Sequence, residues 1–454
     1  MKILLVNPGS DNAFFKVGFV IPPLGLAYIA STVRDAGHDV AIHDFGIERG
    51  GAPDYSAYDL VGISSDTSRN GRAVEIAKDA KAAGAKVVIG GPHVTFMDEE
   101  VLAESSIDFI LRGEAEESAV ELADALDKGL PLYGIAGLSY RKDGVFTRNP
   151  DRDPPQDLDA LPFPARDLLN INRYRNIELA KRRITSIVSS RGCPGNCSFC
   201  CSPKFNGRRW RARSVDSLLS EIRLVVGKYG FGGVAFMDDN FTFDPKRVIE
   251  LSKAIIEEGL DIKWWCFSRV DTVIRNPEIV SWMGRSGCRY IFMGVESPRQ
   301  STLDAYSKKT SADYAKKAVR LLKDNGIETL AGYILGSPDE TRKMVEETIK
   351  FSIKLDTGGV QYTLLTPFPG TDLYADMQDR LLTRDWAKFD CMHPVVRSDH
   401  LVPDELSELL FSAYKSFYIR PKRILISILS TLRGRGVKIK EIKRLIDCLR
   451  KGGA

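Results

Sequence analysis

The chain has 454 residues, of which 43% are hydrophobic and 27% are charged, and its formal net charge at pH 7 is +4. This is the composition of a soluble globular protein, long enough for two domains and an appendage. No apolar run reaches the roughly 18 residues that a membrane helix needs, and the eight cysteines do not resemble a secreted disulfide framework. We therefore expect a cytoplasmic protein without a transmembrane segment.

Residues 1–145 alternate short apolar runs with segments of helical periodicity. This alternation predicts a doubly wound, Rossmann-like α/β domain with a parallel sheet between two helical layers. The expected strands are Ile3–Val6, Val40–Ile42, Leu60–Ile63, Val87–Ile89 and Ile107–Leu111, and the expected helices include Leu24–Ala36 and Gly71–Ala83. No G-x-G-x-x-G follows the first strand, which argues against a dinucleotide site.

Residues 146–182 read as a linker. The stretch Asp151–Pro164 is rich in proline and aspartate and shows little periodicity. Because proline stiffens a chain and removes hydrogen-bond donors, we expect an extended strap that holds the first domain face to face with the second.

Residues 183–372 contain six strand-like runs that alternate with helix-like segments. The pattern predicts a partial (β/α)6 TIM-type barrel that is open on one side. The expected strands are Ile184–Val188, Gly233–Met237, Ile262–Phe267, Tyr290–Val295, Glu328–Leu335 and Val360–Leu365, and the expected helices include Ser214–Tyr229, Pro245–Glu258 and Asp313–Asn325.

Each of these six strands ends in polar or backbone-permissive residues. Active sites of TIM-type barrels lie on the loops after the strands, so we expect the chemistry at this edge. The six stretches are Ser189–Cys201, Asp238–Asn240, Ser268–Asp271, Gly294–Ser297, Gly336–Glu340 and Thr366–Thr371.

Cys193, Cys197 and Cys200 form a C-x3-C-x2-C array on the first of these loops. Soft sulfur ligands on a tight loop select an iron–sulfur centre or zinc. A structural zinc site normally has four protein ligands, whereas a four-iron cluster held by three cysteines leaves one iron open to a small molecule. We predict a four-iron cluster, with a zinc knuckle as the alternative, and expect Cys201 to be a bystander.

Residues 373–454 are expected to form a small helical domain with helices over 404–418, 421–432 and 438–451. Residues 401–454 hold twelve Lys and Arg against five Asp and Glu, a net charge of +7. This basic end is a solvated face, a docking surface for an acidic protein or a membrane-surface patch. Aromatic residues do not interleave with the basic ones there, so we do not expect a nucleic acid partner.

The cysteine array resembles the signature of the radical S-adenosylmethionine (SAM) family, since Phe199 precedes the last cysteine and an apolar run ending in Ser189-Ser190-Arg191 leads into it. In that family the open iron takes the amino and carboxylate groups of SAM. The usual Gly-Gly-Glu after the second strand is replaced here by Asp-Asp-Asn. The resemblance implies SAM contacts at Asp238, Asp239, Asn240, Ser268, Arg269, Glu296 and Ile334.

The ordered set Pro22–Tyr28, Ser64-Ser65, Gly90–His93 and Arg112–Glu114 looks like the cobalamin-binding domain that precedes many radical SAM domains. The cobalt-ligating D-x-H-x-x-G pattern is absent, which implies cobalamin with its own base detached and no protein histidine on cobalt. A flavodoxin-like or regulatory domain is the alternative. The cobalamin contacts that the resemblance implies are Pro22, Leu24, Ser64, Ser65, Asp66, Thr67, Gly90, Gly91, His93, Val94, Gly113 and Glu114.

Together these resemblances imply a cobalamin-dependent radical SAM methyltransferase that acts on an unactivated carbon. In the implied mechanism, the cluster, reduced by an external electron donor, passes one electron to SAM and cleaves it to methionine and a 5′-deoxyadenosyl radical. That radical takes a hydrogen atom from the substrate, and the substrate radical then takes a methyl group from methylcobalamin. We expect a protein or peptide substrate, because the basic tail offers a docking patch and the compact architecture resembles the family member that methylates the α-carbon of a glutamine in methyl-coenzyme M reductase. The alternatives are a cyclase or a lipid- or tetrapyrrole-modifying enzyme with the same cofactors, and a cobalamin-binding sensor with a structural cluster.

Overall fold

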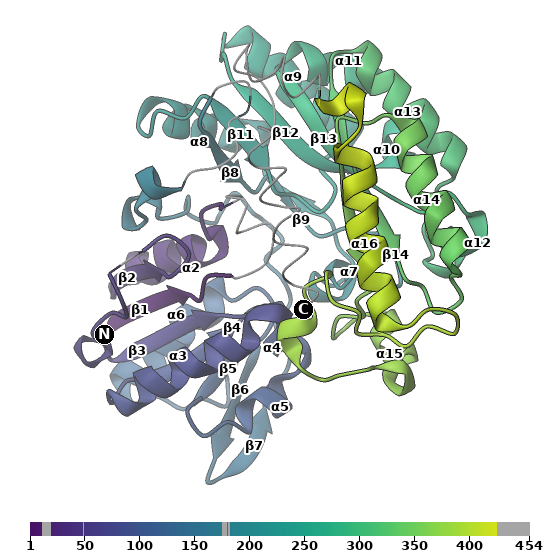
Figure 1. Ribbon diagram of the computed structural model, residues 1–454. Coiled ribbons are helices and arrows are strands. Elements are labelled where there is room, and N and C mark those ends of the chain that lie inside the picture. Colours follow the sequence, from purple (N-terminus) through teal and green to yellow (C-terminus); the bar gives the residue numbers. More distant parts are fainter. Residues whose placement is uncertain (11–19, 49, 175–178, 180–181, 425–454) are drawn as a thin grey trace.

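The structure is a computed structural model that describes residues 1–10, 20–48, 50–174, 179 and 182–424. It contains two α/β domains, which we call the first and the second layer, and a helical segment lies across the second (Figure 1). The first layer is a seven-stranded sheet, in which the first five strands are parallel and the last two form an antiparallel hairpin. In spatial order the strands are β2 (Asp39–Asp44), β1 (Lys2–Asn7), β3 (Leu60–Ser64), β4 (Lys86–Gly90), β5 (Phe109–Leu111), β6 (Leu138–Lys142) and β7 (Val145–Arg148).

Successive side chains of these strands are buried on opposite faces of the sheet, because side chains alternate between the two faces along a strand. Leu5 packs in the cluster that holds α2 (Leu24–Asp35) and α6 (Glu116–Lys128). Leu4 packs on the other face, in the cluster that holds α3 (Asn70–Ala82). The doubly wound domain predicted from the sequence is confirmed. Short helices α4 (Pro92–Phe96) and α5 (Asp98–Leu102) follow β4.

The hairpin β6–β7 is not among the predicted strands. Its turn consists of Asp143 and Gly144, with φ angles of 52° and 80°. An Asp-Gly pair with two positive φ angles is typical of the tightest hairpin turns, so this dipeptide is the signal that would have revealed it.

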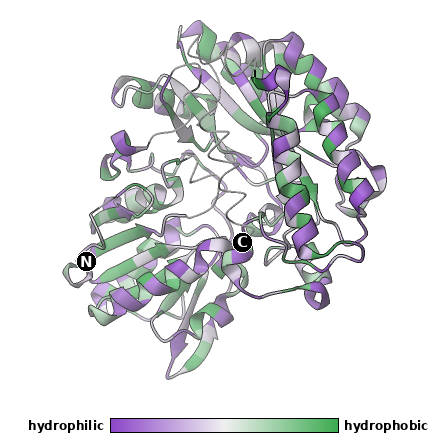
Figure 2. Cartoon of the chain, viewed as in Figure 1, coloured by the Kyte–Doolittle hydropathy of each residue, from purple (hydrophilic) through white to green (hydrophobic). Residues whose placement is uncertain are grey.

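The second layer is a six-stranded, fully parallel sheet, which confirms the partial barrel. Its strands are β8 (Ile184–Ile187), β11 (Gly233–Phe236), β12 (Lys263–Arg269), β13 (Cys288–Glu296), β14 (Glu328–Leu335) and β15 (Gly359–Leu364). Its helices are α8 (Val215–Gly227), α9 (Pro245–Glu257), α10 (Val270–Arg275), α11 (Glu278–Arg285), α12 (Gln300–Ala305), α13 (Ala312–Asp324) and α14 (Arg342–Leu355). Figure 2 shows hydrophobic strands flanked by helices that carry hydrophilic residues.

Side-chain caps fix where the longer barrel helices begin. Ser214, Asp244, Ser311 and Thr341 precede α8, α9, α13 and α14, and each side chain accepts a hydrogen bond from a backbone N–H two or three residues later. Such a cap satisfies a donor that the first turn of a helix leaves free. These caps explain why the predicted helix starts lie within about a residue of the observed ones.

Helix α16 (Pro403–Tyr418) covers the free edge of the barrel sheet at β15. The Tyr414 hydroxyl accepts from the Tyr362 N–H at 3.1 Å and donates to the Tyr362 carbonyl at 2.8 Å. Tyr418 repeats this pair of bonds with Val360, at 3.1 and 2.9 Å. Two hydroxyls thus bond backbone groups that a seventh strand would otherwise pair. The predicted helix over 438–451 and residues 425–432 of the one before it lie outside the described residues.

The linker touches both layers. The Ser31 hydroxyl on α2 donates to the Phe163 carbonyl at 2.5 Å. Arg166, in a short 3-10 turn (Arg166–Leu168), forms a fully buried ion pair with Glu221 of α8 at 2.7 Å. Arg213 pairs with the other oxygen of the same carboxylate. Within the described part of the chain, no helix is both long and apolar enough to cross a membrane.

Candidate functional site

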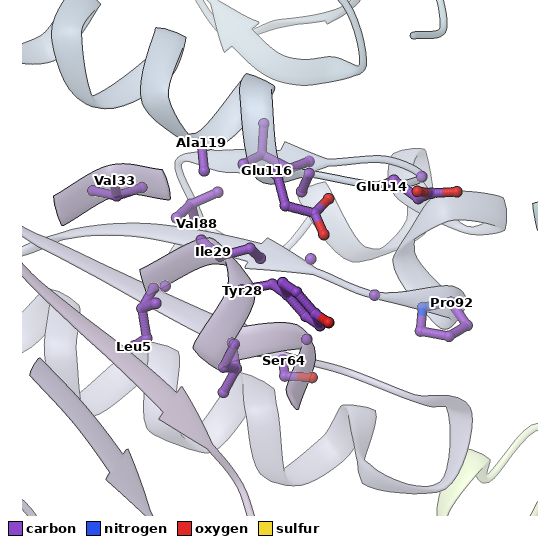
Figure 3. A pocket seen from close by; sticks show the side chains of 18 of the residues that line it. Leu5, Tyr28, Ile29, Val33, Ser64, Val88, Pro92, Glu114, Glu116 and Ala119 are labelled. Atoms are coloured by element: carbon purple, nitrogen blue, oxygen red, sulfur yellow. The ribbon is translucent and has the colours of Figure 1, made fainter. Parts of the chain in front are cut away.

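The strand-end edges of the two layers meet around one cavity of about 400 Å³. Figure 3 labels lining residues from the first layer. The first layer contributes the ends of β3 and β4, helices α2 and α6, and the loop after β5. The second layer contributes the residues after β8 and β11, among them Ser190, Arg191 and Asp239. One cavity is therefore walled by both predicted ligand-binding edges.

Five of the twelve residues predicted at the first edge line this cavity, namely Ser64, Gly90, Gly91, Gly113 and Glu114. Gly91 has a φ of 124°, and a Cβ there would lie 2.3 Å from the Ser65 carbonyl oxygen, so only glycine fits this approach of two backbones. The other seven do not belong to its lining: Pro22, Leu24, Ser65, Asp66, Thr67, His93 and Val94.

Some of these seven have structural partners. The Ser65 hydroxyl donates to Asn70 at 3.1 Å, and Asp66 pairs with Arg69 at 2.7 Å. Val94 is fully buried in the cluster on the α3 face. The structure thus divides the predicted set into residues that line the cavity and residues that do not, of which Ser65, Asp66 and Val94 have partners within the first domain.

His93 is almost completely buried, and neither ring nitrogen has a hydrogen-bond partner among the described residues. Its ring packs edge-on against Trp386, with 5.0 Å between the ring centroids, and the Trp386 indole donates to Glu100 at 2.9 Å. Burial lowers the pKa of His93 to about 4, so the ring is neutral at pH 7. Trp386 comes from a short 3-10 turn (Trp386–Lys388) after the barrel, and no sequence signal placed it here.

The cysteine loop is held at its root by Asp238, a buried residue that lies two positions after the end of β11. Its carboxylate accepts from the Ser189 N–H at 2.7 Å and from the Ser189 and Ser190 hydroxyls at 2.5 and 2.6 Å. Its neighbour Asp239 accepts from the Gly192 N–H at 3.1 Å and is open to the cavity. Asp238 is therefore committed to the loop, and Asp239 is the carboxylate that a ligand can reach.

Cys193 and Cys197 are buried and Cys200 is half-buried. Burial raises the pKa of the Cys193 thiol and raises that of Cys200 to about 12, so bound iron would have to displace protons. No set of three or more Cys, His, Asp or Glu side chains in the described ranges is drawn together around a single ion position. A four-iron cluster binds each thiolate through a different iron, so three cysteines spread along one loop are compatible with it.

Arg269, at the end of β12, lies against the cysteine loop. Its Nη1 donates to the Cys197 sulfur at 3.2 Å and its Nε to Asp271 at 2.9 Å. Ser268, one residue earlier, joins a hydroxyl chain with Thr242 at 2.6 Å. Asn240 is buried one residue after Asp239. Arg269 thus places a positive charge beside a thiolate ligand position.

Glu296, at the end of β13, has a φ of 63° at a bulge between β13 and β14. A non-glycine residue in this conformation is strained and is often found at functional sites. Its carboxylate forms a buried ion pair with Lys308 at 2.7 Å, and the Lys308 ammonium lies 5.7 Å from the centre of the Phe199 ring. No sequence pattern singled out Lys308.

Ile334, near the end of β14, belongs to a small apolar cluster with Tyr306, Leu365 and Leu373. Phe199 of the cysteine loop packs against the same cluster, and the Tyr306 carbonyl accepts from the Ser198 N–H at 3.1 Å. A wall of apolar side chains therefore lies next to the loop that is predicted to hold the iron–sulfur cluster, on the side of β14.

Comparison with known proteins agrees with this geometry. The family profile described as the Radical SAM superfamily matches residues 187–352, and the profile described as the B12 binding domain matches residues 13–123. An uncharacterized methyltransferase from Pyrococcus horikoshii is 41% identical over 93% of this chain and 93% of its own length. The chain belongs to the cobalamin-binding radical SAM methyltransferase family.

Two further relatives span nearly the whole chain. The bacteriochlorophyllide d C-12(1)-methyltransferase of Chlorobaculum tepidum is 30% identical and covers 92% of this chain and 87% of its own. The anaerobic magnesium-protoporphyrin IX monomethyl ester cyclase of Rubrivivax gelatinosus is 29% identical and covers 92% and 78%. The fold is shared with the radical SAM methyltransferase TsrM from Kitasatospora setae with cobalamin and a [4Fe-4S] cluster bound, at a TM-score of 0.75, 19% identity and 99% coverage of both chains.

As a member of this family the chain is a methylating enzyme, and its cofactors are a [4Fe-4S] cluster, SAM and cobalamin. The flavodoxin-like and sensor alternatives are therefore not supported. The residues present fit these groups, because three cysteines lie on one loop and glycines with an apolar floor line the cavity beside it.

A buried ion cluster joins the two cofactor domains of this radical SAM enzyme. Arg191, two residues before Cys193, donates to Glu114 and to Glu116, each at 2.6 Å, and lies over the Tyr28 ring with its Cζ 5.2 Å from the centroid. Arg211, paired with Arg191 across a short two-stranded ladder, also pairs with Glu114. Glu114 was predicted as a cofactor contact. It lines the cavity, but both of its carboxylate oxygens accept hydrogen bonds from these arginines.

Proposed function

We propose that this enzyme methylates an unactivated carbon, with cobalamin at the edge of the first sheet and the cluster with SAM at the edge of the barrel. The observation that carries the proposal is the single cavity lined from both edges, by Ser64 and Gly90 on one side and by Arg191 and Asp239 on the other. When bound, these groups supply a carbon-centred radical and a methyl donor. The chain brings the two sources together at one cavity.

At the first edge, we assign the cobalamin contacts to the five predicted residues that line the cavity, with the other seven holding the loops. Cobalamin is bound with its base detached and without a protein histidine, since His93 is turned against Trp386 and does not line the cavity. Paramagnetic resonance of the cob(II)alamin form tests this. The expected spectrum lacks nitrogen superhyperfine splitting, and a split spectrum that collapses in His93→Phe would contradict the assignment.

At the barrel edge, we assign the cluster to Cys193, Cys197 and Cys200. For SAM, the open carboxylate of Asp239 is the acceptor we assign to its amino group, with Asp238 holding the loop behind it and Asn240 buried beside it. The remaining contacts that we propose are Ser268, Arg269, Glu296 and Ile334. Arg269 serves both the cluster and the SAM carboxylate, because its Nη1 lies on Cys197 and the open iron must lie nearby.

For the substrate, we propose a protein or peptide, such as the α-carbon of a glutamine in methyl-coenzyme M reductase. The support is the basic tail, whose charge suits an acidic macromolecular partner. A tetrapyrrole is the second candidate, because a bacteriochlorophyllide methyltransferase and a protoporphyrin ester cyclase are relatives over most of the chain.

Product analysis of the reconstituted, reduced enzyme separates these functions. A methyltransferase supplied with its substrate forms S-adenosylhomocysteine together with 5′-deoxyadenosine, whereas a cyclase forms 5′-deoxyadenosine without methyl transfer. With methyl-labelled SAM, incorporation into a glutamine-containing peptide supports the first substrate, and incorporation into a chlorophyllide supports the second. Failure to cleave SAM at all would refute the proposed function.

A further inference from the structure

The cavity has two zones along the strand direction. Ser64 and Gly90 stand at the strand ends, whereas Leu60 lies four residues earlier on β3, about 13 Å deeper at the rise of an extended strand. The lining polar side chains belong to the outer zone, near the ion cluster formed by Arg191, Arg211, Glu114 and Glu116. The inner zone is a slot between the sheet and helices α2 and α6 (Figure 3).

The floor of this slot is made by three adjacent strands. Ile3 and Leu5 of β1, Leu60 and Gly62 of β3, and Val88 of β4 share one face of the sheet, because alternate residues of a strand point the same way. All four side chains are at least nine-tenths buried. Gly62 lets the Leu5 side chain lie flat in the floor, since a Cβ there would lie 2.8 Å from Leu5 Cδ2 and 3.5 Å from Val88 Cγ1 and would push Leu5 into the slot.

The helical wall is equally apolar. It is formed by Ile29 and Val33 of α2 and by Ala119 and Leu122 of α6. Among the described residues, no side chain that lines the inner zone carries a hydrogen-bond donor or acceptor.

The backbone offers the slot no free polar groups either. Strands β1, β3 and β4 are each paired on both sides, so their N–H and C=O groups are used within the sheet. The groups of α2 and α6 are used within the helices. A ligand in the slot must therefore leave its own polar atoms without partners.

We infer that this slot selects the corrinoid by its detached base, and that it takes an apolar aromatic base, a benzimidazole or a phenol, in preference to a purine. The inference rests on the proposed binding of cobalamin with its base detached, since a detached base needs a place in the protein. Benzimidazole brings one unbonded ring nitrogen, a phenolic base brings none, and adenine brings several ring nitrogens and an amino group. An unpartnered buried polar group costs enough to weaken binding by about ten-fold or more.

Titration of the apo full-length protein with four corrinoids tests the inference without any catalytic readout. The probes are cobalamin, its phenolic-base analogue, its adenine-base analogue and cobinamide, which has no base. We expect the first two to bind most tightly, with the adenine form about ten-fold or more weaker. Equal affinity for the adenine and benzimidazole forms would overturn the selectivity.

Cobinamide separates this inference from the proposed function. If cobinamide binds as tightly as cobalamin, the slot does not hold the base, and the selectivity fails while corrinoid binding stands. If none of the four binds, the proposed function fails with it.

Two variants localise the effect. Gly62→Ala places a methyl group against Leu5 on the floor, so we expect weaker binding of the base-bearing corrinoids and unchanged binding of cobinamide. Gly71→Ala on α3 is the matched control, because its Cβ would meet nothing within 4 Å. Val88→Thr replaces one methyl group by a hydroxyl at nearly equal side-chain volume. It should therefore reduce the difference in affinity between the benzimidazole and adenine forms. If Gly62→Ala binds all corrinoids as the control does, the slot assignment is wrong.

Discussion

The two strand-end edges around the cavity are built in opposite ways. The edge of the first sheet is hollow, since glycines and apolar side chains leave a slot between strands and helices. The edge of the barrel is filled by polar residues that bond one another: Asp238 to the serines of the cysteine loop, Arg269 to Cys197, and Glu296 to Lys308. The first edge admits a large preformed ligand, whereas the second presents fixed groups to a small one. The same place in two α/β domains, the ends of the parallel strands, can thus provide either an open space or a set of fixed polar groups.

The largest effect is expected at the cysteines of the filled edge. Changing Cys193, Cys197 or Cys200 to Ala should abolish the cluster's absorbance after reconstitution and with it SAM cleavage, because we propose that each thiolate holds one iron. Cys201→Ala is the matched control and should keep both. Loss of the cluster in the control would contradict the three-ligand assignment, and the hollow edge should still bind cobalamin in every variant.

The neighbouring aspartates of the filled edge should differ strongly in their effect on stability. Asp238→Ala leaves a buried N–H and two hydroxyls of Ser189 and Ser190 without their acceptor, and should lower the free energy of unfolding by about 3 kcal/mol or more. Asp239→Ala removes a carboxylate open to the cavity and should cost less than about 1 kcal/mol. Urea unfolding of the apo proteins measures both. Similar losses would mean that Asp238 does not anchor the loop.

Behind the hollow edge, His93 should make stability depend on pH. Its pKa is lowered to about 4 by burial, so the unfolded chain takes up the proton first as pH falls below the usual value of 6.5. The contribution of neutral His93 to the free energy of unfolding is therefore fully present above about pH 6.5 and decreases toward pH 4. The decrease between pH 7.5 and pH 5 is about 2 kcal/mol. His93→Phe keeps the aromatic contact with Trp386 and should lack this component. Thermal melts of the two apo proteins at a series of pH values measure this component. Identical pH profiles for the wild type and His93→Phe would refute the role of His93.

The smallest effect on either edge is expected from the basic tail. Truncation after Gly436 should leave cluster content, cobalamin binding and substrate-free SAM cleavage nearly unchanged. For a large acidic substrate it should raise the apparent Michaelis constant, and added salt should do the same to the full-length enzyme, because such contacts are screened beyond about 8–10 Å. Unchanged salt dependence after truncation would remove the main support for a macromolecular substrate.

Much of this architecture could be predicted because strands and helices follow local periodicity. The observed β14 coincides with the expected strand, and the cysteine array was visible by spacing alone. The partners of single polar residues could not be predicted, since they depend on packing between distant segments. Asp238 and Asp239 are adjacent and chemically identical, yet one is an anchor and the other faces the cavity.

Contacts between the domains were the least visible in the sequence. Arg191 stands in the predicted signature, but its pairing with Glu114 and Glu116 joins residues about 75 positions apart. The contact of Trp386 with His93 spans an even longer stretch and leaves no periodic trace. Such pairs are fixed only when both sheets are in place.

The edge of β15 carries a consequence for association between molecules. Strand edges with unpaired backbone groups recruit strands from other chains, and most proteins prevent this with charge, proline or a bulge. Here two phenol groups on one helix occupy those hydrogen-bonding positions, so the protection depends on side chains that can be removed without altering the strand itself. A Tyr414→Phe, Tyr418→Phe double variant would retain the apolar cover yet leave the N–H and C=O groups of Val360 and Tyr362 without partners, so that local opening of α16 would expose a pairing template to a strand of another molecule.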